Sequence, residues 1–123
     1  KQLMEQLLAV DREDELAPSD QFLQRALQAV QAHLADERFK VSDLAHEMNL
    51  SKTVLHRKFK ALIGDTPNVF IRNVRIRSAA KLLKTSELSV AEIAYTTGFS
   101  QSHYFIKCFK EIYGVTPKQF RAG

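Results

Sequence analysis

An internal repeat constrains this chain more than any other feature of its sequence. The stretch NLSKTVLHRKFKALIGDTP at residues 49–67 returns in modified form as GFSQSHYFIKCFKEIYGVTP at residues 98–117. Each copy has a serine after an apolar residue, then Phe-Lys, and each ends in Gly, one further residue and Thr-Pro. The matching serines are 49 residues apart but the later matches are 50 apart, so the second copy has one extra residue before Phe-Lys.

Both copies have the apolar spacing of an amphipathic helix that follows a tight turn. A serine precedes each helix and is expected to cap it, which predicts caps at Ser51 and Ser100. Asn49 and Gly98 suit the turns, because both residue types accept a left-handed backbone. The predicted buried lines are Leu55, Phe59 and Leu62 in the first copy, and Phe105, Phe109 and Ile112 in the second.

A short helix is predicted before each turn, so that each copy belongs to a helix-turn-helix unit. Ser42 is expected to cap the first short helix, and Ser89 with Glu92 forms a capping-box pattern at the second. The units extend over about residues 42–63 and 90–113. Upstream of both, Ser19 or Asp20 is expected to cap a further helix. In a helix-turn-helix unit the second helix enters the major groove of DNA.

A long helix over about residues 67–84 is predicted to join the two units, with Thr66 as its cap and Pro67 in its first turn. Its apolar residues spread around more than one face, so we expect it to contact two bodies. A helix of this length measures ~27 Å at ~1.5 Å per residue, and successive major-groove faces lie roughly 34 Å apart. With the width of the units added, both can reach adjacent major grooves. No segment alternates with a period of two, so the predicted fold is all-α.

The helix faces opposite the buried lines are mostly polar and basic. Neither face carries an acidic residue, as a DNA-facing surface requires, because carboxylates repel phosphates. The outward residues are Lys52, Thr53, His56, Arg57 and Lys60 in the first copy, and Ser102, His103, Ile106, Lys107 and Lys110 in the second.

The charge of the chain is divided unevenly. Residues 1–40 contain five Lys/Arg and eight Asp/Glu, whereas residues 41–123 contain thirteen and six. The basic part holds the repeat and favours a polyanionic partner, first nucleic acid and second a membrane surface. The single cysteine, Cys108, is expected in the core; it excludes a disulfide framework and indicates a reduced, cytoplasmic setting. No apolar run is long enough to span a bilayer.

Residues 20–122 resemble the DNA-binding domain of AraC/XylS-type transcription regulators. The resemblance rests on SDLAHEMNLSKTVLHRKFKALIGDTP, FIRNVRIRSAAKLL and VAEIAYTTGFSQSHYFIKCFKEIYGVTPKQFR, in this order. It implies about seven helices, with two recognition helices that enter adjacent major grooves and read a specific DNA sequence. The stretch FLQRALQAVQAHLADERFKVSDLA followed by RKFKALIGDTPNVFIR looks most like the output domains of response regulators and hybrid two-component sensors.

The resemblance also implies which residues read bases. They are Thr53, His56 and Arg57 on the first recognition helix, and Ser102, His103 and Lys107 on the second, with Ile106 beside them. Thr53 stands where the family often has a larger residue. Arg57 could instead hold a phosphate, both histidines could lie near the backbone, and Ile106 could touch a thymine methyl or be an isolated exposed residue.

The candidates for phosphate binding are basic residues or residues at helix starts, where backbone N–H groups also bind anions. They are Ser51, Lys52, Lys60, Arg75, Ser100, Gln101, Lys110, Thr116 and Lys118.

Two other functions compete with DNA binding. A protein-interaction module, for example one that binds RNA polymerase, predicts an exposed apolar patch, whereas the outward faces are mostly polar. A small enzyme needs paired ionisable groups, and the repeat gives no reason for a cleft that holds them. The four histidines are too scattered for a metal site, and no cofactor is expected.

Residues 1–18 are predicted to form an upstream linker or a short frayed helix, and residues 19–123 the domain itself. The chain begins without Met, so we expect a regulatory domain upstream, such as a kinase or receiver. The fragment alone is expected to be a cytoplasmic monomer without membrane contact. As part of a hybrid sensor it would be the cytoplasmic end of a membrane protein.

Overall fold

The computed structural model describes residues 17–123, which form seven helices and no strand. The helices are α2 (Pro18–Ala32), α3 (Val41–Glu47), α4 (Lys52–Ile63), α5 (Pro67–Thr85), α6 (Val90–Thr96), α7 (Ser102–Tyr113) and α8 (Pro117–Ala122). This confirms the all-α, seven-helix expectation. The predicted linker, residues 1–18, lies outside the described residues except for its last two, and α2 already begins at Pro18.

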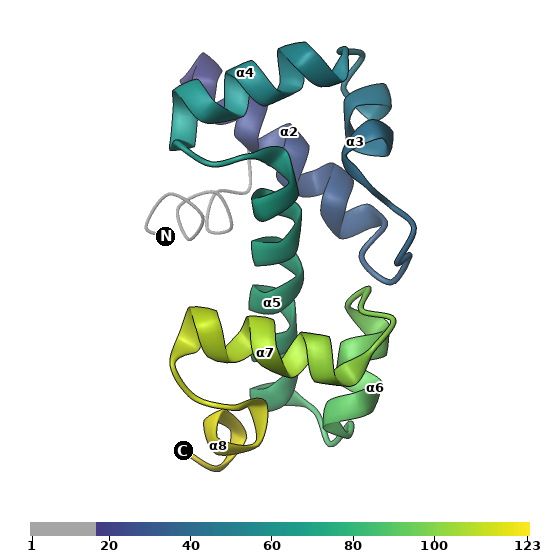
Figure 1. Ribbon diagram of the computed structural model, residues 1–123, viewed down its shortest axis with the longest axis vertical. Coiled ribbons are helices and arrows are strands. Elements are labelled where there is room, and N and C mark those ends of the chain that lie inside the picture. The colour runs from purple at the N-terminus through teal and green to yellow at the C-terminus, as the bar shows by residue number, and fades with distance from the viewer. Residues whose placement is uncertain (1–16) are drawn as a thin grey trace.

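Two hydrophobic cores lie at the two ends of α5, where Figure 1 shows the other helices in two groups. The first half of α5 contributes Phe70, Ile71 and Val74 to a core with α2, α3 and α4. The second half contributes Ile76, Ala79, Ala80 and Leu83 to a core with α6 and α7. We call these halves of the molecule the first module (residues 17–74) and the second module (residues 76–123). The prediction of a connector that is apolar on two sides is therefore correct.

Hydrogen bonds confirm the predicted caps at Ser51, Thr66 and Ser89. The hydroxyl oxygens of Ser51 and Thr66 each accept a backbone N–H three residues later, at 3.2 Å. Ser89 and Glu92 form a reciprocal capping box, in which the Ser89 N–H donates to the Glu92 carboxylate at 2.8 Å. Such caps satisfy backbone donors that the helix itself leaves unpaired.

Two predicted caps near the N-terminus are wrong. Neither Ser19 nor Asp20 caps α2, because Pro18 already stands in its first turn after Ala17. Ser42 lies inside α3, which begins one residue earlier; there the Lys40 N–H donates to the Asp43 carboxylate at 2.8 Å. In α2 the proline lacks the N–H that a cap would satisfy, and in α3 the Asp43 carboxylate accepts the N–H before the first turn.

The extra residue of the second copy lies in the turn between its helices. Helices α3 and α6 start 49 residues apart, whereas α4 and α7 start 50 apart. Gln101 therefore precedes α7 where Ser51 precedes α4, and the predicted Ser100 cap is wrong. The turns themselves are as predicted, since Asn49 (φ 56°) and Gly98 (φ 92°) both adopt the left-handed conformation.

The buried line of α4 also differs at its end. Leu55 and Phe59 are fully buried, but Leu62 is 37% exposed. Ile63 packs against the first core instead, because it lies one helical turn beyond Phe59. In α7, Phe105 and Phe109 are fully buried and Ile112 is half-buried against the second core.

Candidate nucleic-acid interface

The two predicted recognition helices cross α5 near its opposite ends. In Figure 1 both run in the same direction across the view, α4 above and α7 below. Each is anchored by buried aromatic side chains, Phe59 in α4 and Phe105 with Phe109 in α7. Helix α4 and helix α7 have the same length, 12 residues, and both end at a glycine in the left-handed conformation. The two copies of the sequence repeat therefore correspond to two helices of equal length that cross α5 in the same direction.

On α4 the structure exposes the whole predicted outward face. The exposed residues are Lys52, Thr53, His56, Arg57 and Lys60. The Lys60 ammonium also donates to the Gly64 carbonyl at 3.3 Å, so this lysine contributes to the end of its own helix. Lys58, which was not among the predicted residues, is exposed and lies 5.4 Å from the centre of the Phe22 ring.

On α7 four of the five outward residues are exposed, namely Ser102, His103, Lys107 and Lys110. Ile106 is only half-exposed and packs against the second core. The exposed face of α7 is therefore narrower than its sequence pattern predicts, because Ile106 lies at the edge of the buried face. Cys108 is buried in the same core, as predicted.

The residues predicted at helix starts have different surroundings. Ser51, Ser100 and Gln101 are exposed, as are the side chains of Lys110 and Lys118. Thr116 is half-buried, and its hydroxyl accepts the Gln119 N–H at 3.2 Å in a second capping box. A capping hydroxyl leaves the first backbone N–H groups of the helix pointing outward, which is the arrangement that binds a phosphate.

Arg75 is the clear correction among the phosphate candidates. Its side chain is only 5% exposed, and its guanidinium donates to four backbone carbonyls. Burial lowers the pKa of Arg75 and Asp36 acts against this, but arginine keeps its charge at neutral pH. The prediction failed because a basic residue on the connector looks like surface in the sequence, whereas here it lies between the two modules.

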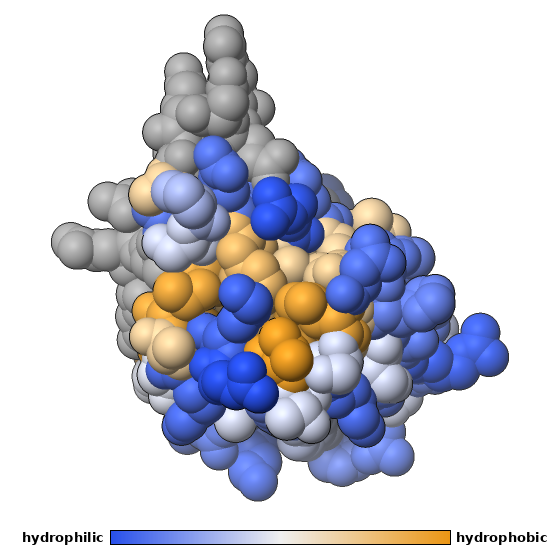
Figure 2. Space-filling view, turned by 90° about the horizontal axis from the view of Figure 1, so that it is seen from above, coloured by the Kyte–Doolittle hydropathy of each residue, from blue (hydrophilic) through white to orange (hydrophobic). Residues whose placement is uncertain are grey.

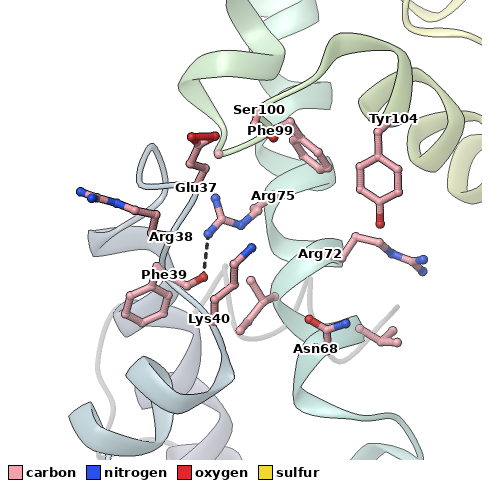
Figure 3. Close-up of a pocket in the computed structure, with 13 residues that line it drawn as sticks. Glu37, Arg38, Phe39, Lys40, Asn68, Arg72, Arg75, Phe99, Ser100 and Tyr104 are labelled. Atoms are coloured by element: carbon pink, nitrogen blue, oxygen red, sulfur yellow. Dashed lines mark hydrogen bonds between the residues drawn. The ribbon is translucent and has the colours of Figure 1, made fainter.

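A groove of about 470 Å³ lies between the modules, beside Arg75. Its other basic residues are Arg38, Lys40 and Arg72, none of which was predicted from the sequence. Figure 3 shows Lys40 pointing toward Arg75, while Arg38 and Arg72 point away on opposite sides. Arg72 lies 3.9 Å from the Glu111 carboxylate. Tyr104 lines the same groove, and a hydrogen bond with Cys108 raises the pKa of Tyr104. No helix within residues 17–123 is long and apolar enough to cross a membrane.

Comparison with known proteins gives a consistent result. Residues 44–123 match the model of a helix-turn-helix domain family. The chain is 37% identical over 102 residues to histidine kinase P4 of Formosa agariphila, covering 83% of this chain but 7% of that protein. Other curated relatives are also much longer, with 34% and 44% of their length covered in two further cases.

Two solved structures share the fold at similar identity. The C-terminal domain of the two-component response regulator yesN from Fusobacterium nucleatum is 34% identical with a TM-score of 0.71, covering 78% of this chain and 93% of that one. The DNA-binding domain of AdpA, solved in complex with a target DNA, is 30% identical with a TM-score of 0.73, covering 82% and 89%.

Proposed function

The chain belongs to the AraC-type helix-turn-helix family, and we propose that it acts as the sequence-specific DNA-binding output domain of a transcription regulator. The observation that carries the proposal is the pair of exposed faces on α4 and α7, which are free of carboxylates and are held by separate cores at the two ends of one helix. Two such faces suit two adjacent major grooves on one side of a duplex.

In this proposal the middle of each exposed face reads bases. Arg57 and Lys107 occupy equivalent positions on α4 and α7, and a long cation there can hold guanine O6 and N7. Thr53, His56, Ser102 and His103 supply shorter hydrogen-bonding groups nearer the helix starts. Ile106, at the edge of its face, would offer an apolar contact to a thymine methyl.

The phosphate contacts would come from the rim of the same faces. Lys52, Lys60, Lys110 and Lys118 are exposed cations, and Ser51, Ser100, Gln101 and Thr116 stand at helix starts. Each phosphate that such a residue neutralises releases condensed counterions, so binding should weaken steeply as salt rises. Under this proposal the domain acts on DNA in the cytoplasm, in agreement with the setting predicted from Cys108.

Selection of binding sites from random duplex DNA at near-physiological salt tests the proposal directly. We expect enrichment of a motif with two parts about one helical turn apart, one part for each recognition helix. The matched control is the double substitution of Arg57 and Lys107 by Ala, which removes both long base-reading cations and leaves the buried residues intact. Enrichment of no motif by the native domain, or of the same motif by the double variant, would contradict the proposal.

We further propose that the domain is the output end of a two-component signalling protein with a regulatory part upstream. Similarity to a histidine kinase and to a response-regulator C-terminal domain supports this, as does the short stretch of each curated relative that the chain covers. The mass of the native protein in cells tests it, since a mass close to that of 123 residues would contradict an upstream domain. The isolated domain should sediment as a monomer at micromolar concentration.

A second candidate function, contact with a protein such as RNA polymerase, is favoured at one place. Figure 2 looks onto the end of the molecule formed by the first module and shows apolar side chains gathered there within a hydrophilic rim. Leu62 of α4 is an exposed large apolar residue of this module. Substitution of Leu62 by Asp should then reduce transcription activation while DNA affinity stays unchanged; an equal loss of both would count against a separate protein contact.

A further inference from the structure

We propose that Arg75 is a positioning residue that fixes the distance and angle between α4 and α7, so that the domain selects DNA by the spacing of two half-sites as well as by their sequence. The inference rests on the proposed DNA-binding function and adds a determinant of specificity that touches no DNA. It replaces the phosphate contact predicted for this residue.

Arg75 lies at the boundary of the two cores. Its neighbours along α5 belong to different modules, since Val74 packs in the first core and Ile76 in the second. The guanidinium therefore leaves the helix at the one level where both modules are within reach.

The four hydrogen bonds of Arg75 bridge the modules. Three go to the first module: Nη1 donates to the Leu34 carbonyl at 2.7 Å, and Nη2 donates to the carbonyls of Asp36 and Phe39 at 3.1 Å and 3.2 Å. Nη1 also donates to the Thr97 carbonyl of the second module at 3.2 Å. Figure 3 shows the guanidinium reaching the segment that carries Phe39. A planar guanidinium fixes direction as well as distance, because its donors have a rigid fork geometry.

These carbonyls belong to segments that lead to the recognition helices. Leu34, Asp36 and Phe39 lie between α2 and α3, directly before the first helix-turn-helix, and Thr97 begins the turn between α6 and α7. Helix pairs with extensive contacts each lie within a module or include α5. Arg75 is thus a polar link between modules that otherwise pack mainly against the connector.

The turn of the second module is shaped to admit the guanidinium. Gly98 follows Thr97 with φ 92°, and a Cβ at this position would overlap the Arg75 guanidinium. The closeness of backbone and side chain means that the turn and Arg75 cannot move independently. A buried guanidinium that loses its acceptors costs free energy. The arrangement of the modules in which Arg75 makes all four hydrogen bonds is therefore favoured over nearby alternatives.

The test measures affinity for duplexes in which the two selected half-sites are separated by the native spacing, or by one or two base pairs fewer or more. Each added base pair moves the second half-site by ~3.4 Å and turns it by roughly 35° around the duplex. We expect the native domain to lose at least tenfold in affinity when the spacing changes by one base pair. The variant Arg75→Gln, which has two donors in place of the fork, should lose less than threefold.

A single half-site serves as the second readout. Arg75→Gln should bind it as well as the native domain, because each module keeps its own core and exposed face. Gly64→Ala is the matched control, since it strains a left-handed glycine that has no atom within 4 Å of the added methyl and lies away from Arg75. This control should lower stability yet keep the sharp spacing preference, so that a general loss of stability is separated from a loss of positioning.

The possible outcomes divide cleanly. A native domain that binds half-sites but tolerates every spacing overturns the inference without touching the proposed function, and this arm holds even if Arg75→Gln does not fold. A folded Arg75→Gln with an unchanged spacing preference overturns it as well. Absence of any preferred DNA sequence in the native domain would instead remove the proposed function on which the inference depends.

Discussion

The backbone of Gly98 lies so close to the guanidinium of Arg75 that no side chain fits at residue 98. A Cβ there would also come within 2.5 Å of the Leu34 carbonyl, which is backbone and cannot easily move. Residue 98 must therefore be glycine for two reasons: its backbone has a positive φ of 92°, and the side chain of Arg75 fills the space that a Cβ would need.

This relationship predicts different costs for alanine at two glycines that share a left-handed backbone. Gly64→Ala should lower the free energy of unfolding by about 1–2 kcal/mol, because only conformational strain is added. Gly98→Ala should lower it by about 3–4 kcal/mol, because the added methyl also displaces Arg75 from its carbonyl acceptors and meets the Leu34 carbonyl. Urea denaturation of both variants and the native domain measures the difference. Equal losses would show that neither the Arg75 hydrogen bonds nor the close approach of Gly98 to the Leu34 carbonyl contributes much to stability.

The two serines of the repeat predict a second contrast. The Ser51 hydroxyl accepts the Val54 N–H at 3.2 Å, so Ser51→Ala should cost about 1 kcal/mol of stability. Ser100 precedes Gln101 and has no capping role at α7, so Ser100→Ala should change stability by less than about 0.5 kcal/mol. Thermal melting followed by circular dichroism distinguishes the two. A similar loss in both variants would mean that Ser100 supports the turn in a way that its exposed position does not indicate.

Local sequence patterns predicted the helices and their grouping well. Apolar spacing in the two copies, with Asn49 and Gly98 before them, was enough to place both helix-turn-helix units. The two-sided apolar pattern of the connector also predicted two cores. The helices and turns depend on residues close in sequence, and the repeat provided each of these predictions twice.

Features that depend on distant backbone groups could not be predicted. Arg75 donates to the carbonyl of Leu34, which is 41 residues away in the sequence, and the pattern of side chains does not show where a backbone carbonyl will lie. The groove cations Arg38 and Lys40 were missed for the same reason, because the α2–α3 segment meets the connector only in the folded chain. The sequence also did not show that the extra residue lies in the turn. A serine in each copy suggested a cap, whereas in the second copy the turn is one residue longer.

The capping box at α6 predicts a specific dependence of stability on pH. The hydrogen bond from the Ser89 N–H holds the pKa of Glu92 below its ordinary value. A group whose pKa is lower in the folded state stabilises the fold above its unfolded pKa, roughly 4.3 for Glu, and this contribution is lost as the pH falls through the folded pKa. Glu92→Gln keeps an acceptor oxygen but has no charge, so the native domain should be more stable at pH 6 and lose this advantage toward pH 3.

Urea denaturation of both proteins at several pH values measures this difference. Asp36 also has a lowered pKa, because it accepts the Arg38 N–H, and it titrates in both proteins alike. It therefore cancels in the comparison. A stability difference that stays constant between pH 6 and pH 3 would contradict the assignment of this advantage to the Glu92 charge.

The last prediction separates base reading from phosphate binding on α4. Arg57 lies in the middle of the exposed face, and Lys60 lies nearer the end of the helix, where its ammonium donates to the Gly64 carbonyl. Arg57→Ala should cost ~1–3 kcal/mol on the preferred site and relax specificity at one position, with little loss on random DNA. Lys60→Ala should weaken binding to all duplexes alike and reduce the salt slope by about one phosphate contact.

Salt titrations of each variant on preferred and scrambled duplexes measure both effects, with melting curves as the control for folding. Arg57→Ala should melt like the native domain, because the Arg57 side chain is exposed. Lys60→Ala should melt slightly earlier, because it loses the interaction with the last carbonyls of α4, an effect worth a few tenths of a kcal/mol. That small loss affects all duplexes equally and so cannot imitate base specificity. If Arg57→Ala weakened preferred and scrambled duplexes alike, Arg57 would bind phosphate, and the bases would have to be read by Thr53 and His56 on the same face.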